Sequence, residues 1–569
     1  MRFRFCFRLM VLLLPLWIPR QPVFAQLTLP ARIDRFVQQV MDSANVPGLS
    51  LALIRNGNIA YSQGYGLVRS DSSQKVTAAT VFDAASLSKP VFAYAVLQWV
   101  DEGQFDLDKP LYQYLPYPDI ESDERYKAIT ARMVLSHRTG FPNWRGSQKL
   151  SIKNPPGQQF GYSGEGFVYL QKVIEALTGK PLNEWMNERV FRPLHMTRSG
   201  YVWRPDFDSD FAYPHTQLGR PRPKQKPRTA NTAYSLQITA DDYAKFILAI
   251  LRSQGLKPAT RSQLLTPQTP LPTRFGRADT TRSKALFWGL GFGLEKTPSG
   301  DYFWHWGDNG TFRCFVAARP ATSASKTDAA LVYFTNSFNG LAITDTMLAN
   351  LLGGQHPAVA FLNYDSYTSP ENRLAQNILK KGVQPAIQSY LSTTGKSPIP
   401  EELMNQIGYQ LLDMGRLDDA VAVLKFNAES YPASANVYDS YGYALLRAGN
   451  PAEAIRNYRR ALELEADLGD AKTVLAGLAA ARKAAGSTKI TLKGYPKAKL
   501  VTLAGAFNDW NHLSTFFTQS SDDWVCTLDL KPGTYAYKIV VDGHWMTDPG
   551  NPVTQKTGDG NTNSVLTVP

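Results

Sequence analysis

Hydrophobic and polar positions follow three different patterns along the chain. Between about residues 30 and 354, the apolar runs Leu49–Ile54 and Ile59–Val68 flank the turn-forming pair Asn56-Gly57, which predicts a β-hairpin. Longer apolar stretches predict helices at Phe92–Val100 and Gly164–Leu177. Strands are expected again late in this region, at Leu286–Leu294, Tyr302–Trp306 and Ala329–Thr335. Strands at both ends with helices between them predict an α+β domain, with an antiparallel sheet covered by helices.

A helical repeat follows, up to about residue 486. Gly382, Gly415 and Gly449 recur at spacings of 33 and 34 residues, each preceded by a leucine-rich helix and followed by an alanine-containing one. The last two units also match at Gly408/Gly442, Tyr409/Tyr443, Leu411/Leu445, Leu412/Leu446, Ala420/Ala454 and Val421/Ile455. The pattern resembles tetratricopeptide repeats over Ser369–Ala485. Such an array is either a groove for a peptide or partner protein or a spacer between domains, and both interpretations stay open.

The remaining residues have short alternating runs separated by turns. Strands are expected at Leu500–Leu503, Trp524–Leu530 and Thr534–Val541, with turns at Pro532-Gly533 and Asp542-Gly543. This pattern predicts an all-β, immunoglobulin-like sandwich. The protein is therefore expected to be multidomain, with an α+β domain at 26–357, helical repeats at 358–486 and a β-sandwich at 487–569.

The first 25 residues form a separate segment. Arg2, Arg4 and Arg8 precede the apolar run Leu9–Pro19, and Val23-Phe24-Ala25 supplies a small residue before Gln26. This is the pattern of a secretory signal peptide, and its apolar part is too short to span a membrane. We expect a secreted or periplasmic protein with no membrane span.

Composition excludes several classes of protein. Of the 569 residues, 43% are hydrophobic and 19% charged, which excludes a largely disordered chain. The formal charge of +13 falls to +9 without the four arginines of the first 25 residues. Because no nucleic-acid-binding motif accompanies this charge, a solvated basic surface is expected rather than a nucleic-acid partner. Beyond Cys6, only Cys314 and Cys526 remain, so no disulfide framework or thiolate metal site is expected. The sequence has no phosphate-binding glycine loop, zinc-spaced histidine pair or dinucleotide fingerprint, so no metal or cofactor is expected.

One short motif carries candidate chemistry. Ser86-Leu87-Ser88-Lys89 leads into an apolar helix, and residues three apart on a helix share a face, which places the Lys89 amine beside the Ser86 hydroxyl. The positive potential of the helix N-terminus favours an alkoxide there, and a desolvated lysine readily gives up its proton. The same spacing occurs at Ser72 and Ser323, without such a helix. Spacing alone equally fits a serine that caps a helix whose lysine is solvated.

The surrounding sequence favours the catalytic interpretation. It contains further motifs in a fixed order: Asp101-Glu102-Gly103, Val134-Leu135-Ser136-His137-Arg138-Thr139-Gly140-Phe141, Pro156-Gly157, Phe160-Gly161-Tyr162-Ser163, Leu177-Thr178-Gly179-Lys180-Pro181 and Pro193-Leu194-His195-Met196. Over about Arg32–Gly354 the chain thus resembles the serine β-lactamase/penicillin-binding-protein superfamily, in its class C β-lactamase, esterase and D-aminopeptidase branch. The resemblance implies an acyl-enzyme mechanism.

It also implies roles for individual residues. Ser86 is the expected nucleophile, Lys89 its proton acceptor, and Tyr162 a second general acid or base, provided that a cation such as Lys89 lowers the pKa of the phenol. His305, in the sequence His305-Trp306-Gly307, is expected to add polarity or charge near Tyr162 or the substrate.

On the same strand, Gly307 is expected to let the substrate pass close to the backbone. The backbone N–H groups of Ser86 and Asp308 are the expected oxyanion hole.

The chain departs from the family pattern after Tyr162, where Gly164 stands in the place of a frequent asparagine. That amide ordinarily holds a substrate amide, and its loss removes ~1–3 kcal/mol of orientation for such substrates. An ester makes no such demand. We therefore expect an esterase acting on small or glycan-linked esters. The alternatives are a D,D-peptidase or β-lactamase acting on cell-wall peptides or β-lactams, and a non-catalytic glycan- or partner-binding protein.

The C-terminal region has a resemblance of its own. Its motifs are Leu503-Ala504-Gly505-Ala506-Phe507-Asn508-Asp509-Trp510, Gly533-Thr534-Tyr535-Ala536-Tyr537-Lys538 and Val540-Val541-Asp542-Gly543-His544-Trp545. They resemble the glycogen-binding domain of AMP-activated protein kinase β subunits. The resemblance implies an α-glucan partner bound by Trp510, Trp545, Lys538 and Asn563, because flat aromatic rings suit the C–H faces of sugars. The alternative is an inert sandwich whose tryptophans lie in the core.

Overall fold

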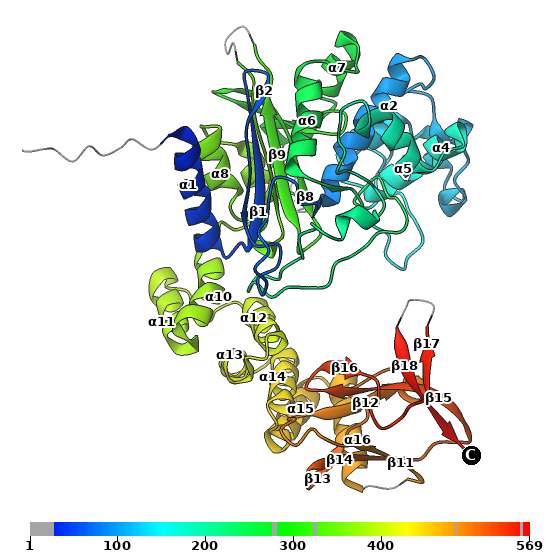
Figure 1. Ribbon diagram of the computed structural model, residues 1–569, viewed down its shortest axis with the longest axis vertical. Helices are drawn as coiled ribbons and strands as arrows, with labels where there is room; N and C mark the ends of the chain where they lie inside the picture. Colours follow the sequence, from blue (N-terminus) through cyan, green and yellow to red (C-terminus); the bar gives the residue numbers. More distant parts are fainter. Residues whose placement is uncertain (1–27, 276–281, 323–326, 484–485, 558–560) are drawn as a thin grey trace, which may run out of the picture.

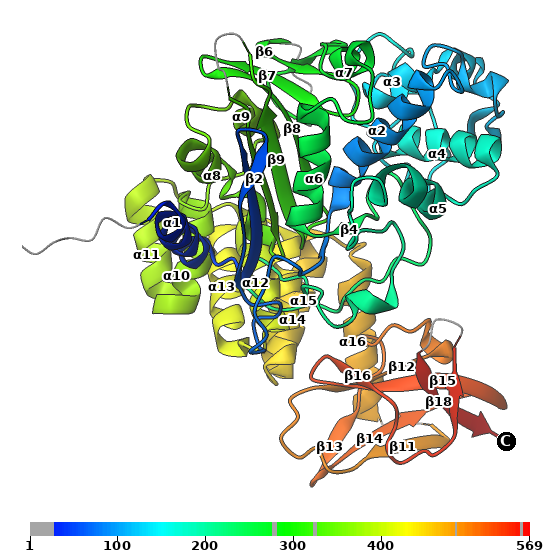
Figure 2. The same ribbon diagram turned by 45° about the horizontal axis from the view of Figure 1, so that its top comes forward.

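The computed structural model describes residues 28–275, 282–322, 327–483, 486–557 and 561–569. The expected signal segment 1–25 lies outside the described residues. Figures 1 and 2 show an α+β domain, a helical segment and a β domain, in that order along the chain. No helix in the described ranges has the length and apolar character needed to cross a membrane. The expected multidomain fold class is confirmed.

The N-terminal domain is built on an eight-stranded antiparallel sheet in the order β2-β1-β10-β9-β8-β7-β6-β5. The expected hairpin forms β1 (Gly48–Arg55) and β2 (Asn58–Gly66), joined by Asn56 and Gly57 with φ of 52° and 70°. The remaining strands are β5 (Thr269–Pro272), β6 (Arg282–Trp288), β7 (Gly293–Thr297), β8 (Gly300–Asp308), β9 (Arg313–Arg319) and β10 (Ala329–Thr335). Because β1 pairs with β10, the two ends of the domain sequence meet inside the sheet.

Helices cover both faces of this sheet (Figure 2). On one face lie α1 (Leu29–Ala44), α8 (Thr344–Leu351) and α9 (Pro357–Leu362), whose buried residues share a core with the sheet. Since α9, Tyr364 and Tyr367 pack there, the packing of this domain extends beyond the expected boundary at 357. The larger core on the other face contains α2 (Ser88–Asp101), α3 (Ala131–Leu135), α4 (Gly164–Thr178), α5 (Leu182–Met186), α6 (Ala240–Leu251) and α7 (Pro258–Leu264).

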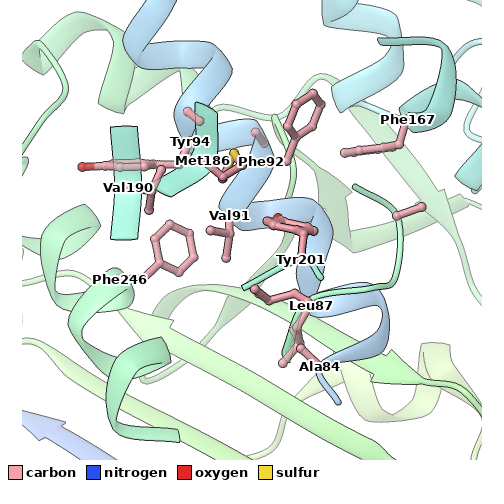
Figure 3. Close-up of a cluster of buried hydrophobic side chains, with 14 of the residues drawn as sticks. Ala84, Leu87, Val91, Phe92, Tyr94, Phe167, Met186, Val190, Tyr201 and Phe246 are labelled. Atoms are coloured by element: carbon pink, nitrogen blue, oxygen red, sulfur yellow. The ribbon is translucent and has the colours of Figure 1, made fainter. Parts of the chain in front are cut away.

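Helix α2 is the centre of that larger core. Over most of its length the helix has no side that faces solvent, since Lys89 through Leu97 are all buried. Figure 3 shows Val91, Phe92 and Tyr94 of this helix surrounded by side chains from other elements, including Phe167 of α4 and Phe246 of α6. A helix buried all round is held by packing on every side, which fixes the position of its N-terminus.

One expected strand is wrong in extent. Leu286–Leu294 is not continuous, because β6 ends at Trp288 and β7 begins at Gly293. Gly291 in the turn between them has φ of 93°, and a β-carbon there would lie 2.6 Å from that of Ala93 on α2. The apolar residues of the turn are buried like strand residues, so their hydrophobicity does not reveal the turn.

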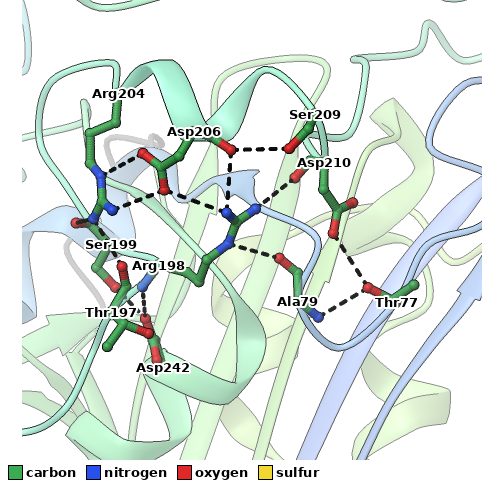
Figure 4. A network of polar contacts seen from close by, with 10 residues as sticks. All are labelled: Thr77, Ala79, Thr197, Arg198, Ser199, Arg204, Asp206, Ser209, Asp210 and Asp242. Carbon is green, nitrogen blue, oxygen red and sulfur yellow. Dashed lines mark hydrogen bonds and ion pairs between the residues drawn. The ribbon is translucent and has the colours of Figure 1, made fainter.

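An ion-pair network holds the approach to α2. In Figure 4, Arg204 forms two hydrogen bonds of 2.9 Å with the Asp206 carboxylate, and Arg198 donates to the carbonyls of Ala79 and Asp210. Thr80 donates to the Asp210 carboxylate at 2.7 Å. These contacts fix the segment that enters the short strand β3 (Phe82–Asp83), which pairs with β4 (Gln237–Ile238).

The described part of the helical segment contains seven helices: α10 (Pro370–Lys381), α11 (Val383–Thr394), α12 (Glu401–Asp413), α13 (Leu417–Ser430), α14 (Ala435–Arg447), α15 (Pro451–Leu464) and α16 (Gly469–Lys483). The helices form the pairs α10/α11, α12/α13 and α14/α15. The two helices of each pair are connected through Gly382, Gly415 and Gly449, whose φ angles are 88°, 74° and 82°. Gly408 and Gly442 face Leu424 and Tyr458 of the paired helices at close range. The repeat spacing therefore marks helix pairs, and their membership of the tetratricopeptide family stays a prediction.

The helical segment packs against the N-terminal domain. Leu218, from a loop of that domain, is buried in the core of the helical segment, and its N–H donates to the side-chain oxygen of Gln410 on α12 at 3.2 Å. Arg220 and Arg222 both pair with the Asp413 carboxylate at the end of α12. An apolar contact flanked by charge pairs joins the two parts.

The C-terminal domain consists of two antiparallel sheets, so the expected all-β class is confirmed, and the immunoglobulin-like topology stays a prediction. One sheet contains β11 (Thr488–Leu492), β14 (Asp523–Leu528) and β13 (Thr518–Ser520). The other contains β12 (Val501–Gly505), β15 (Gly533–Val541), β18 (Thr562–Val568) and β17 (Thr554–Lys556), with β16 (His544–Met546) on β15. Arg447 of α14 donates to the Asp542 carbonyl at 2.9 Å, which joins this domain to the helical segment.

Candidate active site

Ser86 lies on a strained turn at the mouth of α2. Residues Ala85–Leu87 form a single 3-10 turn before the helix, and Ala85 has φ of 45°, a left-handed conformation that is costly for a residue with a β-carbon. The turn is held by the Ala85 N–H, which donates to the Asp83 carboxylate at 2.7 Å, and by the Ser88 hydroxyl, which donates to the Ala85 carbonyl at 2.6 Å. The Ser86 side chain is therefore presented from a fixed backbone.

The Lys89 amine is buried beside Ser86. It donates to Ser86 Oγ at 3.0 Å and to the Ala233 carbonyl at 2.8 Å, and the residue is 1% exposed. Burial disfavours the charged form and lowers the pKa of Lys89 to about 7. Among the residues that the structure describes, no carboxylate contributes to the pKa of Lys89 to oppose this effect. At neutral pH a large fraction of this amine is therefore unprotonated and able to accept the Ser86 proton.

Tyr162 lies over the same amine. Lys89 Nζ is 4.8 Å from the centre of the phenol ring, and the Tyr162 hydroxyl is buried with no well-formed hydrogen bond. Burial raises the pKa of Tyr162, with a smaller opposing effect from the Ser86 hydroxyl. The expectation that Lys89 lowers this pKa is wrong, because the amine faces the ring and desolvation dominates. Tyr162 is thus protonated at neutral pH and suited to donate a proton.

Two neutral histidines complete the lining. His305 Nδ1–H donates to the Trp306 carbonyl at 2.7 Å, which leaves the Nε2 lone pair buried and unpaired. Burial and the nearby Lys89 lower the pKa of His305 to about 3, so His305 supplies polarity and no charge.

The second histidine, His137, lies 4.2 Å from Tyr162 between ring centres, and its Nδ1 accepts from the Ser163 N–H at 3.1 Å. Burial lowers the pKa of His137 as well. Sequence reasoning gave this residue no role, although it stands in one of the quoted motifs. His137 comes to lie beside Tyr162 only through folding, so the spacing of the two residues along the sequence does not predict their contact.

Strand β8 passes directly beside the serine turn. A β-carbon on Gly307 would lie 2.3 Å from the Ala84 carbonyl oxygen and 2.4 Å from Cys314 Sγ. Glycine is thus required for the close approach of strand and turn within the protein. The Asn309 side chain adds a link by donating to the Asp83 carboxylate at 2.8 Å.

Asp308, at the end of β8, is held from three directions. Its carboxylate accepts from Gly310 N–H at 2.7 Å, from Arg313 Nε at 3.1 Å and from the Tyr364 hydroxyl at 2.6 Å. Tyr364 follows α9 and begins the connection to the helical segment. The residue whose N–H is expected to face the oxyanion is therefore positioned partly by that connection.

The four expected carbohydrate-binding residues lie in the C-terminal domain. Lys538 and Asn563 are neighbours on β15 and β18, since Tyr537 pairs with Ser564, and Trp545 pairs with Val540 on β15. Strand alternation places these three on the face opposite the core residues of β15. Trp510, which follows β12, and Trp545 are 36% and 45% exposed, so the rings are not core residues, whereas Asn563 is buried.

A serine hydroxyl bonded to a buried lysine amine, beside an antiparallel strand, is the arrangement of a serine hydrolase. The chain belongs to the beta-lactamase family, whose model matches residues 33–353. Residues 487–569 match the model described as the glycogen recognition site of AMP-activated protein kinase, so the C-terminal domain is a carbohydrate-binding module of that type.

Individual relatives are distant. Protein flp of Staphylococcus aureus strain N315 is 22% identical over 188 residues, covering 30% of this chain and 38% of the relative. Unguisins hydrolase ungD' of Aspergillus campestris is 26% identical over 342 residues, covering 54% of this chain and 62% of the relative. The chain thus matches less than two thirds of either relative's length. The octameric penicillin-binding protein homologue from Pyrococcus abyssi is 20% identical, with a TM-score of 0.50 over 62% of this chain and 82% of its own, and supports the fold.

The pKa of Lys89 predicts the pH dependence of acylation. The pKa is lowered to about 7 and the unprotonated amine is the expected proton acceptor, so kcat/KM should rise with pH through about 7 and then level off. Measuring kcat/KM for an activated ester from pH 5 to 9 checks this, with the uncatalysed rate subtracted. A profile that is flat across pH 7 would contradict the assigned role of Lys89.

The Tyr364–Asp308 hydrogen bond predicts an effect on kcat. Tyr364→Phe removes one of three bonds on the Asp308 carboxylate, at a cost of about 1 kcal/mol, so kcat should fall roughly fivefold with KM unchanged. Tyr169→Phe, which removes a tyrosine hydrogen bond to the Leu115 carbonyl, is the control and should leave both parameters unchanged. Equal losses in the two variants would indicate a general effect on folding.

Proposed function

We propose that this protein is an exported serine hydrolase that cleaves esters through an acyl-enzyme and is held on α-glucan by its C-terminal module. The observation that carries the catalytic part is the 3.0 Å contact between Ser86 and a buried Lys89 whose pKa is about 7. A serine hydroxyl is a weak nucleophile on its own, and a neighbouring neutral amine activates it. Export is supported by the signal-like segment 1–25.

The reaction begins when Ser86 Oγ attacks the ester carbonyl carbon and its proton passes to Lys89 Nζ. The negative charge that develops on the carbonyl oxygen is stabilised by the N–H groups of Ser86 and Asp308. The bond from carbon to the leaving alcohol then breaks, and the alkoxide takes the proton of the Tyr162 hydroxyl, which Lys89 replaces. Water hydrolyses the acyl-serine by the reverse proton transfers, returning the acid and the free enzyme.

Esters are the proposed substrate class because of Gly164. The glycine has no amide to hold the side-chain amide of a peptide or β-lactam, and such a substrate would leave its own polar groups unpaired. An ester of a small or glycan-linked alcohol has no side-chain amide, so it loses no hydrogen bond when a glycine stands at position 164. The reaction needs no metal ion or cofactor, because the serine, amine and phenol supply the nucleophile and the proton transfers.

The proposed tether combines two exposed tryptophans with a lysine. Trp510 and Trp545 offer flat apolar surfaces, and Lys538, on the same face of the sheet as Trp545, is proposed to donate to sugar hydroxyls. The helical segment contacts both flanking domains, which favours a spacer that sets their arrangement. Under this proposal the module raises the local concentration of glycan-linked substrate at the active site.

Ser86→Ala should abolish both ester hydrolysis and labelling by a fluorophosphonate probe, because the attacking oxygen is gone. The measurement is gel-based labelling followed by mapping of the modified residue, together with initial rates on ester, D-amino amide and nitrocefin substrates. Ser72→Ala, at another serine three residues before a lysine, is the matched control and should label like wild type. Labelling that survives Ser86→Ala would refute the mechanism. If the wild-type enzyme is fastest on the D-amino amide or on nitrocefin, esters are not the preferred substrate class.

Glycan binding should depend on the exposed tryptophans. Trp510→Ala and Trp545→Ala should each remove most of the retardation of the protein in gels containing glycogen, since each deletes a stacking surface of a sugar ring. Tyr409→Ala removes an aromatic ring of similar exposure from the helical segment and should migrate like wild type. The tether is refuted if wild type is not retarded, or if all variants are retarded equally.

A further inference from the structure

The position of Gly164, next to the active site, is covered by a tryptophan ring. A β-carbon on Gly164 would lie 2.5 Å from Cη2 and 2.6 Å from Cζ2 of Trp144. The indole therefore occupies the space into which a side chain at position 164 would project. Where the family often has an asparagine side chain, at position 164, this protein therefore has an indole ring.

Trp144 is held in place by both of its chain neighbours. Asn143 accepts hydrogen bonds from the Gly164 N–H through its carbonyl and its side chain, each at 3.0 Å. Arg145 on the other side forms an ion pair of 2.7 Å with the largely buried Glu165 of α4. The backbone on either side of the indole is thus tied to the N-terminus of α4, which keeps the exposed ring over Gly164, two residues after Tyr162.

A second exposed ring meets the first from another loop. Tyr234 lies 5.7 Å from Trp144 between ring centres, with the planes at 78°. Its preceding residue is Ala233, whose carbonyl accepts the 2.8 Å hydrogen bond from the Lys89 amine. The pair is 45% and 48% exposed, although large aromatic rings are usually covered. Two exposed rings from separate loops thus meet, and one of them directly follows the residue whose carbonyl binds the Lys89 amine.

We propose that Trp144 and Tyr234 form the binding surface for an apolar acyl group, so that the enzyme prefers esters of aryl or medium-chain alkyl acids over acetate. The proposal deepens the ester hydrolase function and rests on it. The site combines an uncharged aromatic surface with the absence of a side chain at Gly164. An apolar acyl chain gains from burial against these rings, by roughly fourfold in kcat/KM for each methylene covered.

The same arrangement disfavours a polar acyl side chain. An amide placed against Trp144 would exchange hydrogen bonds to water for contact with an aromatic ring, which leaves its polar atoms unpaired. The side-chain oxygen and the carbonyl of the adjacent Asn143 already accept from the backbone at Gly164. Acyl selectivity at this site is therefore set by the two rings.

The test compares p-nitrophenyl acetate, butyrate, octanoate and benzoate, which share one leaving group. In wild type, kcat/KM should rise at least tenfold from acetate to the longer or aromatic acids. Trp144→Ala and Tyr234→Ala should each remove most of that preference, by lowering kcat/KM for octanoate and benzoate far more than for acetate. Tyr409→Ala, in the helical segment, is the matched control and should retain the full preference. A preference that survives in the Trp144→Ala/Tyr234→Ala double variant overturns the proposal.

A binding measurement separates this proposal from the catalytic one. In Ser86→Ala, which cannot be acylated, p-nitrophenyl octanoate should bind at least tenfold more tightly than p-nitrophenyl acetate by calorimetry. Adding Trp144→Ala should bring the two affinities together. If Ser86→Ala binds the two esters equally, the proposed acyl-binding surface is wrong, whether or not the wild-type enzyme hydrolyses esters. If Ser86→Ala prefers octanoate but the wild-type enzyme hydrolyses no ester, only the proposed catalytic function is wrong.

A second variant tests the relation between the ring and Gly164. Gly164→Asn alone should lower activity on all esters, because the new side chain meets the indole. Trp144→Ala/Gly164→Asn should tolerate the asparagine and shift relative activity from octanoate towards D-amino amides. If the double variant keeps the octanoate preference of wild type, Trp144 does not set the acyl specificity.

Discussion

The chemistry proposed for this protein depends on a lysine amine that is kept out of water without a negative charge beside it. Lys89 is buried on the central helix of the larger core of the N-terminal domain, and its amine contacts only a serine hydroxyl and a carbonyl as hydrogen-bond partners among the residues described. Desolvation therefore controls its pKa, which falls to about 7. A solvated lysine at the same spacing would stay protonated and could not accept the Ser86 proton. Under the proposed mechanism, the large apolar core around α2 is thus needed for activity as well as for stability.

The same burial sets the protonation of the groups around the amine. It raises the pKa of Tyr162 and lowers that of His305, so the phenol keeps its proton and the imidazole stays neutral. At neutral pH the site therefore contains a largely unprotonated amine and a protonated phenol, with no fixed positive charge from His305. This division of roles follows from one dielectric environment acting on acids and bases in opposite directions.

The three parts of the chain are mechanically connected. The Leu218 loop is buried in the helical segment, and Tyr364 at the start of the connection bonds to Asp308 at the end of the catalytic strand. At the other end, Arg447 contacts the turn next to Trp545. The carbohydrate-binding module and the hydrolase domain are therefore joined through a packed helical segment rather than a loose linker.

Local sequence determined those features that depend on neighbours along the chain. The hairpin at Asn56-Gly57, the buried helix after Ser86 and the Ser86–Lys89 pair follow from turn chemistry, hydrophobic runs and helical spacing, which act over a few residues. Features that combine residues from distant segments of the chain were decided only by the tertiary structure. Four features depend on groups that folding brings together: the break in the strand at Gly291, the raised pKa of Tyr162, the position of His137 and the indole over Gly164. Desolvation and steric exclusion are properties of a whole packed environment, and no short pattern of residues encodes them.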